Sequence, residues 1–235
     1  MKPYTYILIL FFTVVICFVA SFHRRIRFHK HFGTFLLSAT IVAIPFIMWD
    51  VWFTSAGVWW FNFSYTTGIN FLGLPLEEWL FFYCIPFSCV FTYFCLQKFF
   101  DPARAVVFNN VIAFAGFIMC VLAMLLYSNN IYTFITAIVT LLTLLFLHFI
   151  AKKEWLGAAT LTYILLMPGF LSVNGILTGS GIDQPIVNYD PSEITGIRIF
   201  TIPIEDVAFG YCMFILNIYF FKLIEERKTK TIAFV

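Results

Sequence analysis

The chain has 235 residues, of which 62% are hydrophobic and only 11% are charged. Such a composition is too apolar for a soluble domain and is typical of an integral membrane protein. The net charge is only +2, and basic loops beside membrane helices need no nucleic-acid partner to explain them. The six cysteines lie in apolar runs without paired metal-ligand spacing, which argues against a disulfide framework and a zinc site.

Seven apolar runs are long enough to cross a bilayer, whose hydrocarbon core of about 30 Å requires about 20 helical residues. In chain order they are 4–22, 32–53, 71–96, 106–127, 131–150, 155–178 and 197–221. The first run does not have the form of a secretory signal, because its apolar stretch is long and its basic cluster follows it. We therefore predict an all-α integral membrane fold of about seven transmembrane helices.

The basic residues concentrate in alternate loops of this arrangement. The segments 24–30, 98–104, 152–153 and 222–230 hold twelve of the fourteen Lys and Arg residues, and only Lys2 and Arg198 fall on the other side. Because basic residues favour the cytoplasmic side, this asymmetry predicts that the N-terminus is outside and the C-terminus is inside.

An internal repeat organises the chain. Residues 61–84 align with residues 189–212 without gaps, giving nine identical pairs in 24 positions. Both copies contain a Pro-x-Glu-acid motif, Pro75-Leu76-Glu77-Glu78 and Pro203-Ile204-Glu205-Asp206. We predict two parallel three-helix repeats, residues 1–103 and 129–235, joined by a linker helix in 104–128. Both motifs are then expected at one depth, near the outer leaflet.

Five acidic residues lie in or at the end of apolar runs: Asp50, Glu77, Glu78, Glu205 and Asp206. Ionisable groups there are costly and usually face a bundle interior or a cavity. If the third helix starts near Ile69, Glu77 lies about 12 Å along its axis, deep enough for desolvation to matter. Two neighbouring carboxyl groups cannot both ionise cheaply, so one can keep its proton and act as an acid. The alternative is a helix cap at the interface, since proline and carboxylates both suit a first turn.

Aromatic residues make up 21% of the chain, and four tryptophans crowd the outer end of the second run and the loop after it: Trp49, Trp52, Trp59 and Trp60. Tryptophans commonly form interfacial belts, but aromatic faces also stabilise cations. The sequence contains no Gly-rich dinucleotide fingerprint and no Walker loop, so flavin binding and nucleotide hydrolysis have no support.

The two acidic motifs, with Trp79 after the first and Trp49-Asp50 ahead of it, resemble the membrane-type lycopene cyclase domains. The resemblance covers the whole chain as the fused two-domain form of the heterodimeric bacterial enzyme, a form found in bacteria, archaea and fungi. It implies a lycopene β-cyclase, an isomerase that converts the linear ends of lycopene to β-ionone rings without net redox change. Such a reaction requires an acid and a base, and we expect no metal and no other cofactor.

We therefore predict that the catalytic groups are Glu77, Glu78, Glu205, Asp206 and Asp50. Glu77 or Glu205 is the expected proton donor, with Glu78 or Asp206 as base or charge partner. Because adjacent helical residues point about 100° apart, not all four motif acids can face one substrate end. The expected substrate contacts are Trp49, Trp52, Pro75, Pro203 and Asn174.

The expected partners are lycopene or a related acyclic carotene and the lipid bilayer, with no nucleic acid, in a bacterial cytoplasmic membrane. A homo-oligomer, or contact with other carotenoid enzymes, stays open. We expect one composite site between the repeats that cyclises the two substrate ends in turn. A proton-coupled transporter also places carboxylates inside a bundle of repeats, and a non-catalytic carotenoid-binding protein is a third alternative.

Overall fold

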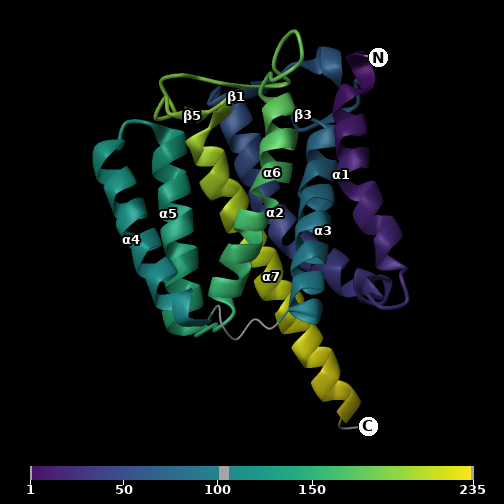
Figure 1. Ribbon diagram of the computed structural model, residues 1–235. Helices are drawn as coiled ribbons and strands as arrows, with labels where there is room; N and C mark the ends of the chain where they lie inside the picture. The colour runs from purple at the N-terminus through teal and green to yellow at the C-terminus, as the bar shows by residue number, and fades with distance from the viewer. Residues whose placement is uncertain (1, 101–105, 234–235) are drawn as a thin grey trace.

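The computed structural model describes residues 2–100 and 106–233, and in this part of the chain seven helices are long and apolar enough to cross a membrane. They are α1 (Thr5–Ser21), α2 (Phe32–Ala56), α3 (Leu76–Phe99), α4 (Asn109–Leu126), α5 (Ile131–Leu145), α6 (Leu156–Leu177) and α7 (Ile204–Ala233) (Figure 1). A π-helical turn, Phe146–Ile150, extends α5. The predicted all-α membrane fold is confirmed.

The described residues include six short strands, which lie at the end of the bundle that also holds the N-terminus, and the C-terminus lies at the opposite end (Figure 1). They form three antiparallel pairs: β1 (Trp59–Phe61) with β4 (Val187–Tyr189), β2 (Asn70–Phe71) with β3 (Leu74–Pro75), and β5 (Arg198–Ile199) with β6 (Ile202–Pro203). The last two pairs are equivalent hairpins, one in each repeat, whereas the first pair joins the repeats. We call residues 57–75 and 178–203 the cap.

The third helix begins at Leu76, so the expected start near Ile69 is wrong. The chain turns sharply before it, because Gly73 has a φ of 84° and Leu76 N–H closes the hairpin on the carbonyl of Ile69 at 2.8 Å. The second repeat closes its hairpin with the equivalent hydrogen bond, from the N–H of Ile204 to the carbonyl oxygen of Ile197 at 3.0 Å. Glu77 therefore stands in the first turn of α3, not about 12 Å along it.

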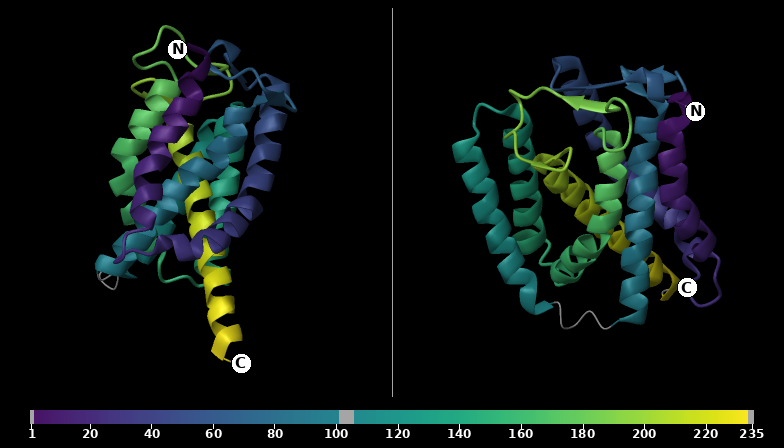
Figure 2. Two further views of the ribbon diagram at one scale, coloured as in Figure 1. Left: turned by 90° about the vertical axis from the view of Figure 1, so that its right-hand side faces the viewer. Right: turned by 45° about the horizontal axis from the view of Figure 1, so that its top comes forward.

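The helices pack as two similar sets. In the first repeat α1 and α2 pack on α3, and in the second α5 and α6 pack on α7. The sets are joined by α2 against α7 and by α6 against α3, while α4 packs mainly on α5 at the periphery (Figure 2). The predicted boundary between residues 103 and 104 lies outside the described residues.

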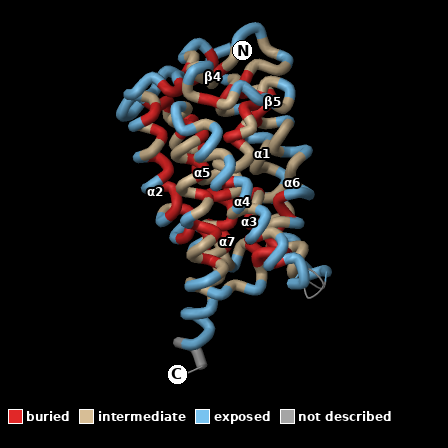
Figure 3. The backbone as a smooth tube through the Cα atoms, turned by 90° about the vertical axis from the view of Figure 1, so that its left-hand side faces the viewer, coloured by how far each residue is buried: buried red, intermediate tan, exposed pale blue. Residues whose placement is uncertain are grey.

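Burial is concentrated inside the bundle and under the cap, whereas residues 226–230 of α7 are exposed (Figure 3). One core cluster lies toward the cap and includes Phe53, Trp59 and Phe82, and a second lies toward the other end and includes Phe28 and Leu147. Many exposed side chains on the outer helix faces are large and apolar. A lipid-facing surface explains them, since lipid tails are as apolar as these side chains.

Asn109 fastens the peripheral helix α4 to the start of α6. Its Nδ2 donates to the carbonyl of Glu154 at 2.6 Å, and its Oδ1 accepts the N–H of Gly157 at 2.5 Å. The N–H groups in the first turn of a helix have no partner within the helix, so the Asn109 side chain supplies one.

Replacing Asn109 by Leu is expected to lower the free energy of unfolding by about 1–3 kcal/mol, because the Gly157 N–H is left buried without an acceptor. The neighbouring Asn110 is exposed, so Asn110→Leu is a matched control that should change stability little. Thermal unfolding in detergent, followed by circular dichroism, measures both. Equal midpoints for the two variants would contradict this role of Asn109.

Candidate active site

A cavity of about 720 Å³ lies under the cap, with walls from α1, α3, α6 and α7. This volume is in the range of small-molecule sites. Most of the wall is apolar, but three carboxyl groups reach it: Asp50 from α2, Glu78 from α3 and Asp206 from α7. The cavity is therefore shared by the two repeats, and each repeat contributes the second acid of its motif.

Tyrosine hydroxyls hold both of these second acids. Tyr6, near the start of α1, donates to Oε2 of Glu78 at 2.5 Å. Tyr132, at the equivalent place in α5, donates to Oδ1 of Asp206 at 2.7 Å, and Tyr189 of β4 donates to Oδ2 at 2.8 Å. Each repeat thus pairs a tyrosine from its first helix with an acid from its third, and Asp206 receives an additional tyrosine from the cap.

Asp50 reaches the cavity from the last turns of α2. Trp59 Nε1 donates to its Oδ1 at 2.7 Å, while its Oδ2 is buried and accepts no hydrogen bond from the described residues. The carboxyl of Glu78 is close enough to those of Asp50 and Asp206 to interact with both electrostatically. Three acidic groups from three helices therefore form one cluster.

Glu77 and Glu205 do not line the cavity. Oε1 of Glu77 accepts the N–H of Thr67 at 2.7 Å, and Oε1 of Glu205 accepts the N–H of Thr195 at 2.6 Å. Both thus bind the cap at equivalent positions of the repeat. Glu205 also accepts the hydroxyl of Thr133 at 2.6 Å. Residues adjacent in a helix point about 100° apart, so Glu77 and Glu205 can bind the cap while their neighbours Glu78 and Asp206 reach the cavity.

Of the five expected substrate contacts, Asn174 lines the cavity and the other four do not. Trp49 packs behind the wall against Phe209, with ring centroids 5.0 Å apart. Trp52 is 48% exposed on the outer face of α2. Pro75 and Pro203 are buried where their hairpins enter α3 and α7.

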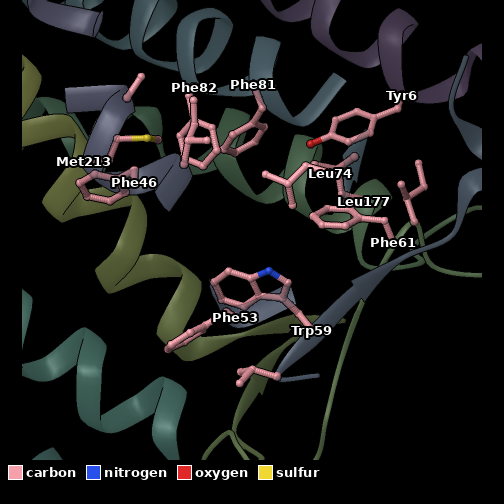
Figure 4. Packing of buried hydrophobic residues seen from close by; sticks show 14 of the residues in the cluster. Tyr6, Phe46, Phe53, Trp59, Phe61, Leu74, Phe81, Phe82, Leu177 and Met213 are labelled. Carbon is pink, nitrogen blue, oxygen red and sulfur yellow. The ribbon is translucent and has the colours of Figure 1, made fainter. Parts of the chain in front are cut away.

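The aromatic residues that do contact the carboxyl groups were not among the expected site residues. These are Tyr6, Trp59, Tyr132 and Tyr189. Figure 4 shows the Tyr6 hydroxyl directed inward from α1, with Trp59 and Phe81 in the same cluster. One sequence signal could have found two of them: each repeat has a tyrosine near the start of its first helix, 72 residues before Glu78 and 74 residues before Asp206.

Tyr189 lies in the cap and remains a hydrogen-bond donor at neutral pH. Desolvation in the cavity wall, and then the negative charge of Asp206, raise the pKa of Tyr189 well above its usual value. Arg198 lies over its ring at 5.8 Å and is the nearby cation that opposes this shift. Within residues 2–100 and 106–233, no group of three or more His, Cys, Asp or Glu side chains is arranged to hold a metal ion.

Comparison with known proteins identifies the family. The model of the lycopene cyclase family matches residues 3–96 and 129–224, which are the two repeats without the linker helix α4. Tyr6 and Tyr132 each fall three residues after the start of a matched segment. No curated protein and no solved structure matches the chain. Because the family model matches both repeats, and the described residues include seven apolar helices long enough to cross a membrane, this integral membrane protein belongs to the lycopene cyclase family.

Proposed function

We propose that this protein is a lycopene β-cyclase, an isomerase that closes the linear ends of lycopene by proton addition and proton loss. The observation that supports it best is the cluster of Asp50, Glu78 and Asp206 at the cap end of a largely apolar cavity. An apolar wall suits a hydrocarbon chain, and the carboxyl groups are the acid and base that the reaction needs.

The reaction balances without a further reactant. A carboxylic acid protonates the terminal double bond and leaves a tertiary cation. The neighbouring alkene attacks this cation, so that a carbon–carbon bond closes the ring and the positive charge moves onto a ring carbon. A carboxylate then removes a proton from the ring, which restores a double bond. The carbon that loses the proton decides between a β and an ε ring, and we propose the β ring.

The hydrogen bonds suggest how the roles divide. Asp206 accepts a tyrosine hydroxyl on each oxygen, an arrangement that suits a carboxylate acting as base or as counter-charge to the cation. Glu78 accepts one hydroxyl and shares its surroundings with Asp50. Since two close carboxyl groups in an apolar site relieve their repulsion by keeping a proton, we propose that Glu78 and Asp50 supply the acid.

Aromatic rings in the wall suit the cationic intermediate. Trp59, Phe81 and Phe209 line the cavity beside the carboxyl cluster. Ring faces attract a cation more strongly in a site without water, and they offer no nucleophile that would trap it. Glu77 and Glu205 act as positioning residues in this proposal, because each ties the cap to the turn that carries the acid.

The rival functions make different demands on the cavity. A proton-coupled transporter needs a polar path for its solute, whereas this wall is mostly hydrocarbon. A carotenoid-binding protein would need no acid cluster. Purified protein supplied with lycopene alone separates the three: cyclic product supports the cyclase, and a shifted absorption band without product supports the binding protein. We propose a bacterial cytoplasmic membrane as the location, with the cap and N-terminus outside.

Glu78→Gln and Asp206→Asn are expected to lower cyclisation by about 10²–10⁴-fold, the usual contribution of a general acid or base. Glu77→Gln and Glu205→Gln are the matched controls, because the amide oxygen still accepts the N–H of Thr67 or Thr195. The controls should remain at least about tenfold faster than the variants of the second acids. Product chromatograms from lycopene-accumulating cells, normalised to folded protein, measure all four. If the control residues lose as much activity as the others, the division of roles is wrong.

We propose a single reaction site in this acidic cavity, so the two ends of the substrate should react one after the other. Because the polyene is about as long as the bilayer is thick, the half-cyclised product must leave and turn, or pass to another copy, before its second end reacts. In liposomes with limiting enzyme and excess lycopene, the monocyclic product should accumulate early and decline as the bicyclic product rises. Bicyclic product from the first turnover, without that lag, would require two sites acting together.

A further inference from the structure

The cavity is not closed on all sides. Four of the residues that line it are also exposed on the outer surface: Leu8 and Phe12 of α1, and Gly169 and Ser172 of α6. All four lie within helices that can span a membrane. Gly169 is about 12 Å along α6 from its end at the cap, at a rise of 1.5 Å per residue, so this opening faces lipid tails and not water.

The opening continues as a groove toward the other end of the bundle. On α3 the lining runs from Glu78 to Thr92, about 21 Å along the helix axis, and on α1 it continues to Cys17. This length is about two-thirds of the hydrocarbon core. α1 and α6 lie beside each other at this face and make few direct contacts (Figure 2). The groove therefore lies between two helices that do not pack closely enough to exclude lipid.

We call the gap between α1 and α6 a seam, and the equivalent seam in the other repeat lies between α5 and α2. These two helices also make few direct contacts, but aromatic rings from α2, α5 and α7 occupy the space between them. Phe209 packs against Phe46 and Trp49, each at 5.0 Å between ring centroids. Phe53 of α2 reaches Tyr132 of α5 at 6.0 Å. Phe46, Trp49 and Phe53 lie outside the cavity. The two equivalent seams thus differ in the described part of the chain, because side chains fill one and leave the other open.

We propose that the seam between α1 and α6 is the lateral entrance from the bilayer, and that it holds the linear polyene lengthwise with one end at the acidic cluster. This inference rests on the proposed function and adds the route and the orientation of the substrate. A long apolar ligand in a lipid-facing groove leaves no hydrocarbon in water, while its end reaches Asp50, Glu78 and Asp206. Gly169 determines the width of the opening, because it lies at the edge and has no side chain there.

Gly169→Phe tests the entrance. A Cβ at Gly169 meets no atom within 4 Å, so the ring can be accommodated by the fold while it projects at the opening. Leu165→Phe is the matched control: it places the same ring one turn earlier on α6, at a residue that is 65% exposed and does not line the cavity. Phe12→Ala trims the opening from the side of α1. Two rates are measured in nanodiscs with added lycopene: the appearance of induced circular dichroism in the polyene band, and the formation of cyclic product.

We expect Gly169→Phe to slow both rates by about tenfold or more, the effect of about 1.4 kcal/mol added to the barrier. Leu165→Phe should match the wild type, and Phe12→Ala should take up polyene at least as fast. Unchanged uptake in Gly169→Phe, or equal slowing in Leu165→Phe, would overturn the entrance. If Gly169→Phe does not fold, Ser172→Phe replaces it under the same criteria.

The two proposals can fail separately. If the wild type binds lycopene but forms no ring, and Gly169→Phe blocks that binding, the groove is supported and the cyclase is not. If the wild type forms rings and Gly169→Phe forms them equally fast, the cyclase is supported and the entrance is not.

Discussion

The burial of carboxyl groups in an apolar bundle is the constraint on which the rest of the structure depends. An acidic group in such a place is stable only with hydrogen-bond partners. Here those partners come from distant parts of the chain: Tyr6 for Glu78, Tyr132 and Tyr189 for Asp206, and Trp59 for Asp50. The hydrogen bonds that these acids require therefore fix how α1, α5 and the cap pack on α3 and α7.

The cap solves a second problem raised by these acids. The four acids of the two motifs stand in the first turn of α3 and α7, where a helix end would normally meet the interface and water. The hairpins β2–β3 and β5–β6 fold over these turns, and the strand pair β1–β4 closes the space between the repeats. Glu77 and Glu205 bind this cap through backbone N–H groups, so one acid of each motif anchors the cover and the other reaches the cavity.

The two repeats are similar but differ locally, and both contribute side chains to one shared acidic cavity in the described part of the chain. Each repeat has an acid and a tyrosine that binds it, so Glu78 and Asp206 both line the shared cavity. The seams beside that space differ. Phe209 of α7 packs on Phe46 and Trp49 of α2 and helps to fill the seam between α5 and α2. Gly169 and Ser172 of α6 are exposed at the seam between α1 and α6. Aromatic packing occupies the seam that is equivalent to the proposed entrance.

The sequence by itself determined the seven spans, the parallel repeat and the residues at which acids enter the bundle. Apolar run length sets a membrane helix, and the spacing of Pro-x-Glu-acid is the same in both copies, so these features are local properties of the chain. The family resemblance, carried by the same motifs, also came from sequence and is confirmed by the match over both repeats.

Only the tertiary structure decided which acid of each pair faces the cavity. α3 starts at Leu76, seven residues after Ile69, and Glu77 therefore lies in its first turn. A strand of only two residues within an apolar run, such as β2, has no pattern that the sequence would reveal. The tyrosine partners lie more than 70 residues from Glu78 and Asp206, apart from Tyr189. Their hydrogen bonds, and the open seam between α1 and α6, depend on how whole helices pack, because contacts at such separation are set by the fold and not by local pattern.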